Sequence, residues 1–256
     1  MSLPLRALLS TVLRPLLGAL GLFGLWWLLA LTTSPAILPT PWPVLMQLGD
    51  ALFTAQLWQD TGITLSNVLA SFVLALIGGV TLGLLAARQE WIEKALHPLM
   101  VVGESAPTIA WLVLAILWLG LGAGPAILVG VSMALPLIFI ATVHGLKQID
   151  TGLLDMARIY RLSPWTKLTR LLLPSLALTL AGAASGALSV AWRGVIMAEA
   201  FSASAGLGPA LWGGYLYGDI VPVYAHILWI ILLGLLLEYL VIHPIRRLIH
   251  ARLHQR

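Results

Sequence analysis

Long apolar segments alternate with short polar segments along this chain of 256 residues. Six apolar segments are each close to the roughly 20 residues that an α-helix needs to cross a bilayer. The predicted spans are residues 15–31, 62–86, 97–119, 125–143, 172–200 and 222–242. A transmembrane barrel would instead show alternating apolar and polar residues. The pattern therefore predicts an all-α membrane protein with six transmembrane helices.

The polar segment 148–174 lies between the fourth and fifth spans and predicts a pair of short helices. In its first half, apolar residues recur at helical spacing and predict one apolar face, formed by Ile149, Leu153, Met156, Ala157 and Tyr160. Asp155 and Arg158 are three residues apart, so their side chains can pair on another face. Such a helical pair either docks a partner or forms a solvated basic loop.

The second helix of this segment has a clear start signal. Ser163 is a good N-cap residue, and Pro164 suits the first helical position. The helix is predicted to continue until Pro174, which interrupts or kinks it because proline lacks a backbone N–H.

Composition supports a membrane protein. The chain is 60% hydrophobic and 9% charged, whereas a soluble domain has about 25% charged residues. The absence of cysteine excludes disulfides and thiolate chemistry.

The distribution of the basic residues predicts the orientation. The outer loops 32–61, 120–124 and 201–221 contain no Lys or Arg, and Arg193 lies within a span. The other thirteen of the fourteen basic residues fall in the inner segments: Arg6, Arg14, Arg88, Lys94, Lys147, Arg158, Arg161, Lys167, Arg170, Arg246, Arg247, Arg252 and Arg256. This positive-inside pattern predicts that both termini are cytoplasmic, and it explains the net charge of +4 without nucleic acid.

Four ionisable residues fall within the predicted spans: Glu104, Arg193, Glu199 and Glu238. Such residues usually face a cavity or a partner, because a charge is costly in hydrocarbon. One hypothesis is that Glu104 and Arg193 pair across a translocation pathway, and another is that Arg193 binds an anionic substrate. A purely structural ion pair is the third interpretation.

Other candidate residues have simpler explanations. Trp111 and Trp192 either line the pathway or pack in the membrane core. His250 and His254 lack a third ligand, so no metal site is predicted. The spans show no His-rich or Ser–His constellation, which argues against an intramembrane enzyme and predicts no catalytic residue.

The spacing within 148–174 resembles the coupling loop of permease subunits of bacterial binding-protein-dependent ABC transporters. That loop contains Glu-Ala-Ala, three residues, Gly, nine residues, Ile, one residue and Leu-Pro. The corresponding positions here are Asp155-Met156-Ala157, Arg161, Leu171 and Leu173-Pro174. Met156 and Arg161 depart from the pattern. Either the turn at Arg161 has another geometry than the family's glycine turn, or Arg161 adds a contact to the ATPase.

Further motifs extend the resemblance over about residues 20–245. They are Ala110-Trp111-Leu112, the run 117–122, Ala198-Glu199 and Gly206-Leu207-Gly208. The most similar branch is that of the taurine, aliphatic sulfonate and nitrate permeases.

The resemblance implies a single permease domain over 1–256, with the fold of a type I ABC importer permease, in the bacterial inner membrane. It implies a homodimer, two cytoplasmic ATPase subunits and an extracytoplasmic solute-binding protein. Its coupling residues would be Asp155, Met156, Ala157, Arg158, Arg161, Ser163 and Pro164. The chain has no Gly-x-x-x-x-Gly-Lys-Ser/Thr loop, so ATP and Mg would be bound by the partner ATPase, and this chain is not expected to be an enzyme.

The solute stays open. A sulfonate- or nitrate-like anion is the first expectation, and a thiamine-precursor-like compound is a further one. The rival function is an ion- or proton-coupled secondary transporter that uses Glu104, Glu199 and Glu238 as relays. Many such transporters have repeated halves, which are not evident in this sequence.

Overall fold

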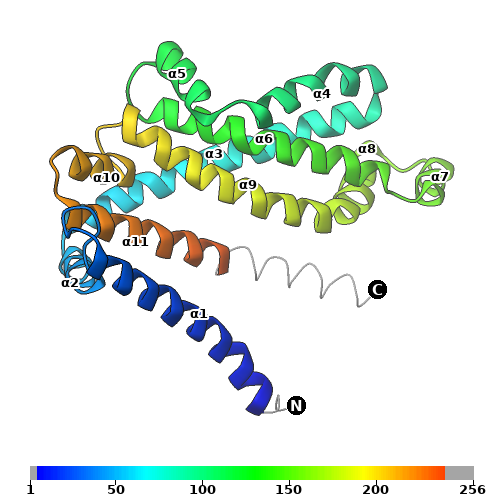
Figure 1. Ribbon diagram of the computed structural model, residues 1–256. Helices are drawn as coiled ribbons and strands as arrows, with labels where there is room; N and C mark the ends of the chain where they lie inside the picture. The colour runs from blue at the N-terminus through cyan, green and yellow to red at the C-terminus, as the bar shows by residue number, and fades with distance from the viewer. Residues whose placement is uncertain (1–4, 240–256) are drawn as a thin grey trace. The chain divides into compact units, whose positions relative to one another are not determined.

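The computed structural model describes residues 5–239, and every element within that range is helical (Figure 1). The all-α expectation is confirmed. The chain forms two compact units, the residues up to 58 with 211–229 and the residues 59–210 with those from 230 on. The basic residues from Arg246 on and the pair His250 and His254 lie outside the described range.

The first unit contains α1 (Leu5–Thr32), α2 (Pro41–Ala51) and parts of α10 (Leu207–Leu216) and α11 (Ile220–Leu237). Its core is formed by Val44, Leu48 and Ala225, which are all buried. The rings of Trp26 and Tyr224 stack against this core with their centroids 6.3 Å apart. Trp26 therefore buries an aromatic ring while its Nε1 donates to the Pro39 carbonyl at 3.1 Å.

The second unit contains α3 (Ala55–Arg88), α4 (Glu90–Ser105), α5 (Thr108–Leu119), α6 (Ala123–Lys147) and α9 (Leu173–Ser202). Figure 1 shows α6 and α9 running side by side, with α7 beyond the end of α6. Small residues dominate the buried cluster among α3, α6 and α9, which consists of Ala75, Ala134, Ile138, Ala187 and Ala191. Small side chains allow helix backbones to approach closely, which is how helices pack where no hydrophobic effect draws them together.

The contact between α3 and α6 is one example of such close packing. A Cβ added at Gly83 would lie 2.6 Å from the Thr142 Cβ, and one at Gly79 would lie 2.8 Å from the Ile138 Cβ. Both distances are far below van der Waals contact. The two glycines therefore set how near α3 comes to α6.

Five of the six predicted spans lie on helices as far as the structure describes them. Within residues 5–239, four helices are long and apolar enough to cross a membrane, and they are Ala55–Arg88, Ala123–Lys147, Thr179–Ser202 and Ile220–Leu237. The pair α4 and α5 adds a fifth if it is one broken span. The apolar stretch of α1 at Leu17–Thr32 is shorter.

The third predicted span, 97–119, is wrong as a continuous helix. It is broken between α4 and α5, whose axes differ by 104°. Ala106 has extended backbone angles (φ −69°, ψ 133°) because the following Pro107 disfavours the helical conformation of the preceding residue.

Candidate functional site

The segment after α6 begins with a capped helix, α7 (Thr151–Ile159). Asp150 is its N-cap residue, and its Oδ1 accepts a hydrogen bond from the Gly152 N–H at 2.8 Å. Aspartate at this position satisfies one of the free N–H groups at a helix start. Asp150 was not singled out from the sequence, although Asp directly before a periodic apolar run is a start signal.

The end of α7 is a left-handed turn at Arg161, whose φ is +48°. The Leu162 N–H donates to the Ala157 carbonyl at 3.0 Å, and the Arg161 N–H donates to the Arg158 carbonyl at 3.1 Å. These two bonds define a Schellman motif, which usually has glycine at the left-handed position. Of the two alternatives for Arg161, the one with another turn geometry is therefore wrong: Arg161 adopts the conformation that a glycine favours.

The second helix of the pair starts as predicted. The Ser163 Oγ accepts from the Thr166 N–H at 3.1 Å, and α8 (Pro164–Lys167) begins at Pro164. A π-helical segment, η1 (Leu168–Leu172), then leads into α9. Leu172, directly before α9, keeps helical backbone angles (φ −69°, ψ −53°), so the helical path is continuous from Pro164 into α9. The regular α-helix is interrupted by the π-helical segment directly before Leu173 and Pro174.

The predicted apolar face of α7 is divided by the fold. Ile149 and Ala157 are buried, with 9% and 4% of their surface exposed. Four other apolar side chains of α7 and its C-cap are exposed, and we refer to them as the α7 apolar surface: Leu153, Met156, Ile159 and Tyr160. The buried residues attach α7 to its own chain, whereas the α7 apolar surface is available to another molecule.

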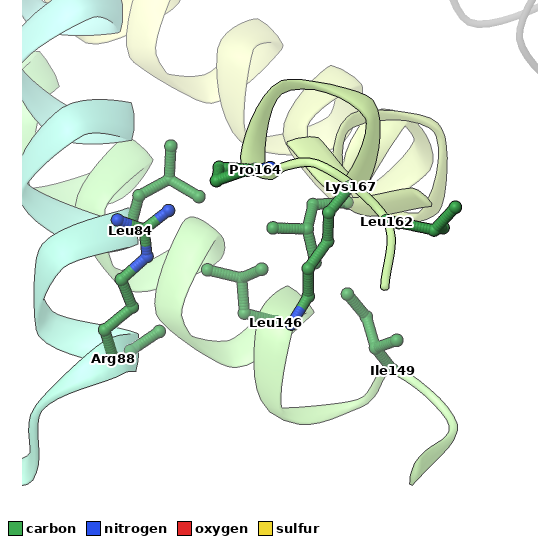
Figure 2. Close-up of a pocket in the computed structure, with 9 residues that line it drawn as sticks. Leu84, Arg88, Leu146, Ile149, Leu162, Pro164 and Lys167 are labelled. Carbon is green, nitrogen blue, oxygen red and sulfur yellow. The ribbon is translucent and has the colours of Figure 1, made fainter. Parts of the chain in front are cut away.

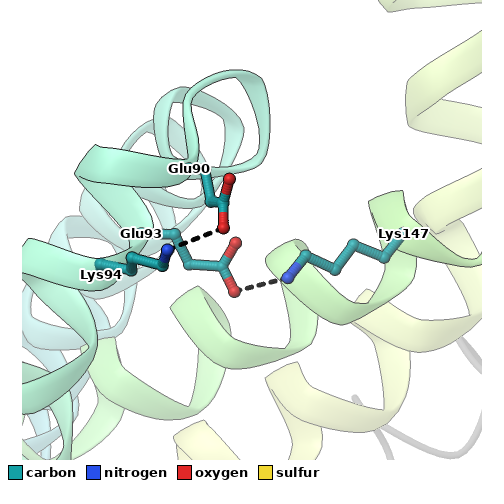
Figure 3. A network of polar contacts seen from close by, with 4 residues as sticks. All are labelled: Glu90, Glu93, Lys94 and Lys147. Carbon is teal, nitrogen blue, oxygen red and sulfur yellow. Dashed lines mark hydrogen bonds and ion pairs between the residues drawn. The ribbon is translucent and has the colours of Figure 1, made fainter.

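Ion pairs form on α7, within α4 and between α4 and α6. The predicted pair of Asp155 and Arg158 is confirmed at 3.0 Å on the exposed side of α7. Lys147, at the end of α6, donates to Glu93 of α4 at 2.6 Å, while Glu90 pairs with Lys94 at 2.8 Å (Figure 3). The bond from Lys147 to Glu93 joins the end of α6 to the start of α4.

Two of the candidate intramembrane charges are on exposed surfaces. Glu104 and Arg193 are both exposed, and no ion pair joins them among the residues that the structure describes. The Arg193 Nε donates to the Ser189 carbonyl one helical turn earlier, at 3.2 Å. Arg193 also lines a cavity of about 390 Å³ between α9 and the later part of α11, together with Ser189, Trp192 and Glu238.

The two candidate tryptophans differ in their surroundings. Trp192 is buried, and its ring lies against Gly234 of α11, where an added Cβ would be 3.1 Å from the Trp192 Nε1. Trp111 is half-buried, and its Nε1 is a buried donor without an acceptor in the described part of the chain.

Glu199 lies in a fully buried polar cluster. Its Oε2 accepts from the Thr64 hydroxyl at 2.7 Å, and its Oε1 accepts from the Asn67 amide at 2.8 Å. The Leu207 N–H donates to the Thr64 Oγ1 at 2.9 Å, and the Gly206 N–H donates to the Asp60 carboxylate at 2.9 Å. We refer to Asp60, Thr64, Asn67, Glu199 and Gly206 as the Glu199 cluster. It joins α3 and α9 to the turn before α10.

Glycine is required in this cluster. Gly206 has φ +121°, and a Cβ there would lie 2.9 Å from the Glu199 Oε2. A Cβ at Gly208 would lie 2.5 Å from the Ile196 carbonyl oxygen. The Gly-Leu-Gly motif thus lets the start of α10 approach the end of α9.

The sequence profile of the binding-protein-dependent transport system inner membrane components matches residues 79–250, which is more than half of the chain. The chain belongs to this family. It is a membrane permease subunit of an ABC transporter. The family resemblance seen in the sequence is confirmed.

Curated relatives cover most of the permease. A probable ABC transporter permease protein of Brucella melitensis is 30% identical over 90% of this chain and 93% of its own length. The riboflavin transport system permease protein RibX of Chloroflexus aurantiacus is 32% identical over 76% of this chain and 75% of its own. The putative aliphatic sulfonates transport permease protein SsuC of Escherichia coli is 31% identical over 81% of this chain and 80% of its own length.

A solved structure has the same fold as the permease. A chain of the MetNI methionine ABC transporter, determined in an inward-facing conformation, superimposes with a TM-score of 0.57 at 24% identity. The match covers 77% of this chain and 94% of that chain.

Three residues of the permease's Glu199 cluster were missed from the sequence, although a signal was present. Asp60, Thr64 and Asn67 follow one another at spacings of four and three, so they share one face of α3. Polar residues on one face of a membrane-spanning helix predict a buried polar contact. Within residues 5–239, no group of three His, Asp or Glu side chains is placed to hold a metal ion.

Proposed function

We propose that α7 is the coupling helix of this permease and that the α7 apolar surface is the docking site for a cytoplasmic ATPase subunit. The observation that carries this proposal is the exposure of four large apolar side chains on one short, doubly capped helix. Met156 is 41% exposed and Ile159 is 78% exposed. Exposed apolar side chains of this kind mark interaction sites, and the caps at Asp150 and Arg161 hold the helix in shape for a partner.

The complete transporter contains two copies of this chain, two ATPase subunits and an extracytoplasmic solute-binding protein. ATP and Mg are bound by the ATPase subunits, and nucleotide-driven closure of these subunits moves α7. Ile149 and Ala157, which attach α7 to its own chain, transmit that movement to the spans. The protein resides in the bacterial inner membrane with both termini in the cytoplasm, an orientation supported by the positive-inside charge distribution.

The transported solute is a small anion, with a sulfonate as the first candidate. Arg193 supports this class because it is an exposed cation on a membrane-spanning helix and no carboxylate pairs with it among the described residues. Ser189, one helical turn before Arg193, is also exposed on this face of α9. SsuC, the sulfonate-named relative, agrees with an anion, whereas RibX is named for another solute, so the family alone does not decide the substrate.

A transport assay with the reconstituted complex tests the solute class. Proteoliposomes that contain the permease, its ATPase and its binding protein should take up a sulfonate only with ATP. Arg193→Ala should reduce uptake at least tenfold, and Arg193→Lys should retain part of it because the charge stays. Unchanged uptake in Arg193→Ala would exclude the substrate role, and uptake driven by a proton gradient without ATP would indicate a secondary transporter.

The pairing hypothesis needs a separate set of variants. If Glu104 and Arg193 pair across the pathway between two copies, then Glu104→Arg and Arg193→Glu should each abolish uptake. The double exchange should restore it. Loss of uptake in all three variants would leave Arg193 as a solute contact alone.

A further inference from the structure

We refer to residues 148–174 as the coupling segment. A cavity of about 430 Å³ lies between this segment and the ends of α3 and α6. It is bounded by the end of α3, the end of α6, the turn between α7 and α8, and the residue before α9. Seven of its nine lining residues are apolar, and the other two are the cations Arg88 and Lys167. Figure 2 shows these two side chains reaching from α3 and α8 toward the same space.

The two cations have no counterion within the described part of the chain. Among the described residues, neither the Arg88 nor the Lys167 side chain forms an ion pair or a hydrogen bond, and no carboxylate lines the cavity. The acidic residues of this end are bound elsewhere: Glu90 to Lys94, Glu93 to Lys147 and Asp155 to Arg158, while Asp150 caps α7. The cavity therefore has an uncompensated positive charge next to an apolar wall.

The apolar residues of this wall indicate which kind of anion would bind. Leu84, Leu146 and Leu172 belong to the ends of three helices that lead into the apolar part of the molecule. A free inorganic anion would gain nothing from these side chains. An amphiphile with an anionic head and an apolar tail would satisfy both the cations and the leucines.

We propose that this cavity binds the headgroup of an anionic phospholipid of the phosphatidylglycerol class, with its phosphate between Arg88 and Lys167. The proposal goes beyond transport and rests on the proposed orientation, which places this end at the inner membrane surface. Basic pockets between spanning helices on the cytoplasmic side are suited to such headgroups. A bound lipid would connect α3 to the turn that holds α7, so lipid composition would affect how firmly the coupling segment is braced.

Lipid binding to the purified full-length chain tests the proposal. Native mass spectrometry in neutral detergent, with phosphatidylglycerol or phosphatidylcholine added, gives the relative affinities. The wild type should prefer phosphatidylglycerol, and the double variant R88Q/K167Q should bind it roughly thirtyfold more weakly, because each basic side chain contributes a factor of about five. The matched control K94Q/R170Q removes the same charge outside the cavity and should bind within twofold of the wild type.

Further variants keep the test decisive if R88Q/K167Q is unstable. The exchange R88K/K167R retains both charges and should retain the preference for phosphatidylglycerol. Equal binding by R88Q/K167Q and the wild type would overturn the proposal. Binding of inorganic phosphate or glycerol phosphate with the same affinity as the lipid would also overturn it, because it would indicate a site for a free anion. Loss of ATPase capture with unchanged lipid binding would assign the two cations to the ATPase interface instead. The lipid-binding outcomes are independent of whether the proposed transport function or the ATPase-docking role of α7 is correct.

Discussion

The Glu199 carboxylate and the Asn67 side-chain amide lie 2.8 Å apart, so α9 is bound to α3 inside the second unit. Thr64 satisfies the other carboxylate oxygen and at the same time accepts from the Leu207 N–H. Both carboxylate oxygens therefore have a donor in a fully buried site. This geometry supports a role in holding the α3, α9 and α10 ends together.

We expect Glu199→Ala to destabilise the chain by about 2–4 kcal/mol, because it leaves the Asn67 amide and the Thr64 hydroxyl without their acceptor. Chemical unfolding of the purified chain in detergent measures this difference. Glu104→Ala, which removes an exposed carboxylate, should change the unfolding free energy by less than about 0.5 kcal/mol. A Glu199→Ala chain that unfolds like the wild type but has lost transport would instead place Glu199 in the pathway.

Replacing Arg161 with glycine should relieve backbone strain in the turn after α7. A side chain in the left-handed conformation costs about 1 kcal/mol, so Arg161→Gly should stabilise the turn by about that amount. Hydrogen exchange of the amides of α7 measures the effect. Arg161→Ala is the control, because it removes the guanidinium but keeps the Cβ and should give no stabilisation. Loss of ATPase binding in both variants would show that the arginine side chain is a docking contact.

Gly186 offers a test of the homodimer. Among the described residues, no atom lies within 4 Å of a Cβ added at Gly182 or Gly186, so these glycines do not pack closely against the described part of the chain. We expect Gly186→Leu to leave the chain folded but to weaken its association with a second copy. Light scattering of the purified protein in detergent measures the mass.

The control for this variant is Gly83→Ala. Its Cβ would lie 2.6 Å from the Thr142 Cβ, so it should destabilise the single chain by about 1–3 kcal/mol. A Gly186→Leu protein that remains dimeric would exclude this face of α9 from the interface.

Local signals in the sequence were sufficient to predict the start of the second helix and the ion pair within the coupling segment. The Ser163 cap, the helix start at Pro164 and the pair of Asp155 and Arg158 depend on residues three or fewer apart, and all three are present. The break before Pro107 also had a local cause, but the apolar run around it favoured one continuous span.

Features that depend on distant residues could not be predicted in this way. Glu199 and Asn67 are 132 positions apart, so only the folded chain shows that they meet. The division of the α7 apolar face has the same origin. Ala157 and Met156 are neighbours with similar periodic signals, yet the fold buries one and exposes the other.

This division changes which substitutions test coupling. Because Ala157 is buried, a charged residue there would disturb the attachment of α7 to its own chain. Met156 and Ile159 are exposed, so charging them alters the outer surface and leaves the Schellman bonds in place. Phe53, which is 94% exposed between α2 and α3, is a matched apolar position far along the chain from α7.

Co-purification of the cognate ATPase subunit with the tagged, full-length permease tests the central claim most directly. The double variant M156E/I159E should fold like the wild type but retain at least tenfold less ATPase, because two buried charges would be left unpaired in the interface. The control Phe53→Glu should retain it fully. Full retention of the ATPase by M156E/I159E, with ATP-driven uptake intact, would contradict the assignment of α7 as the coupling helix.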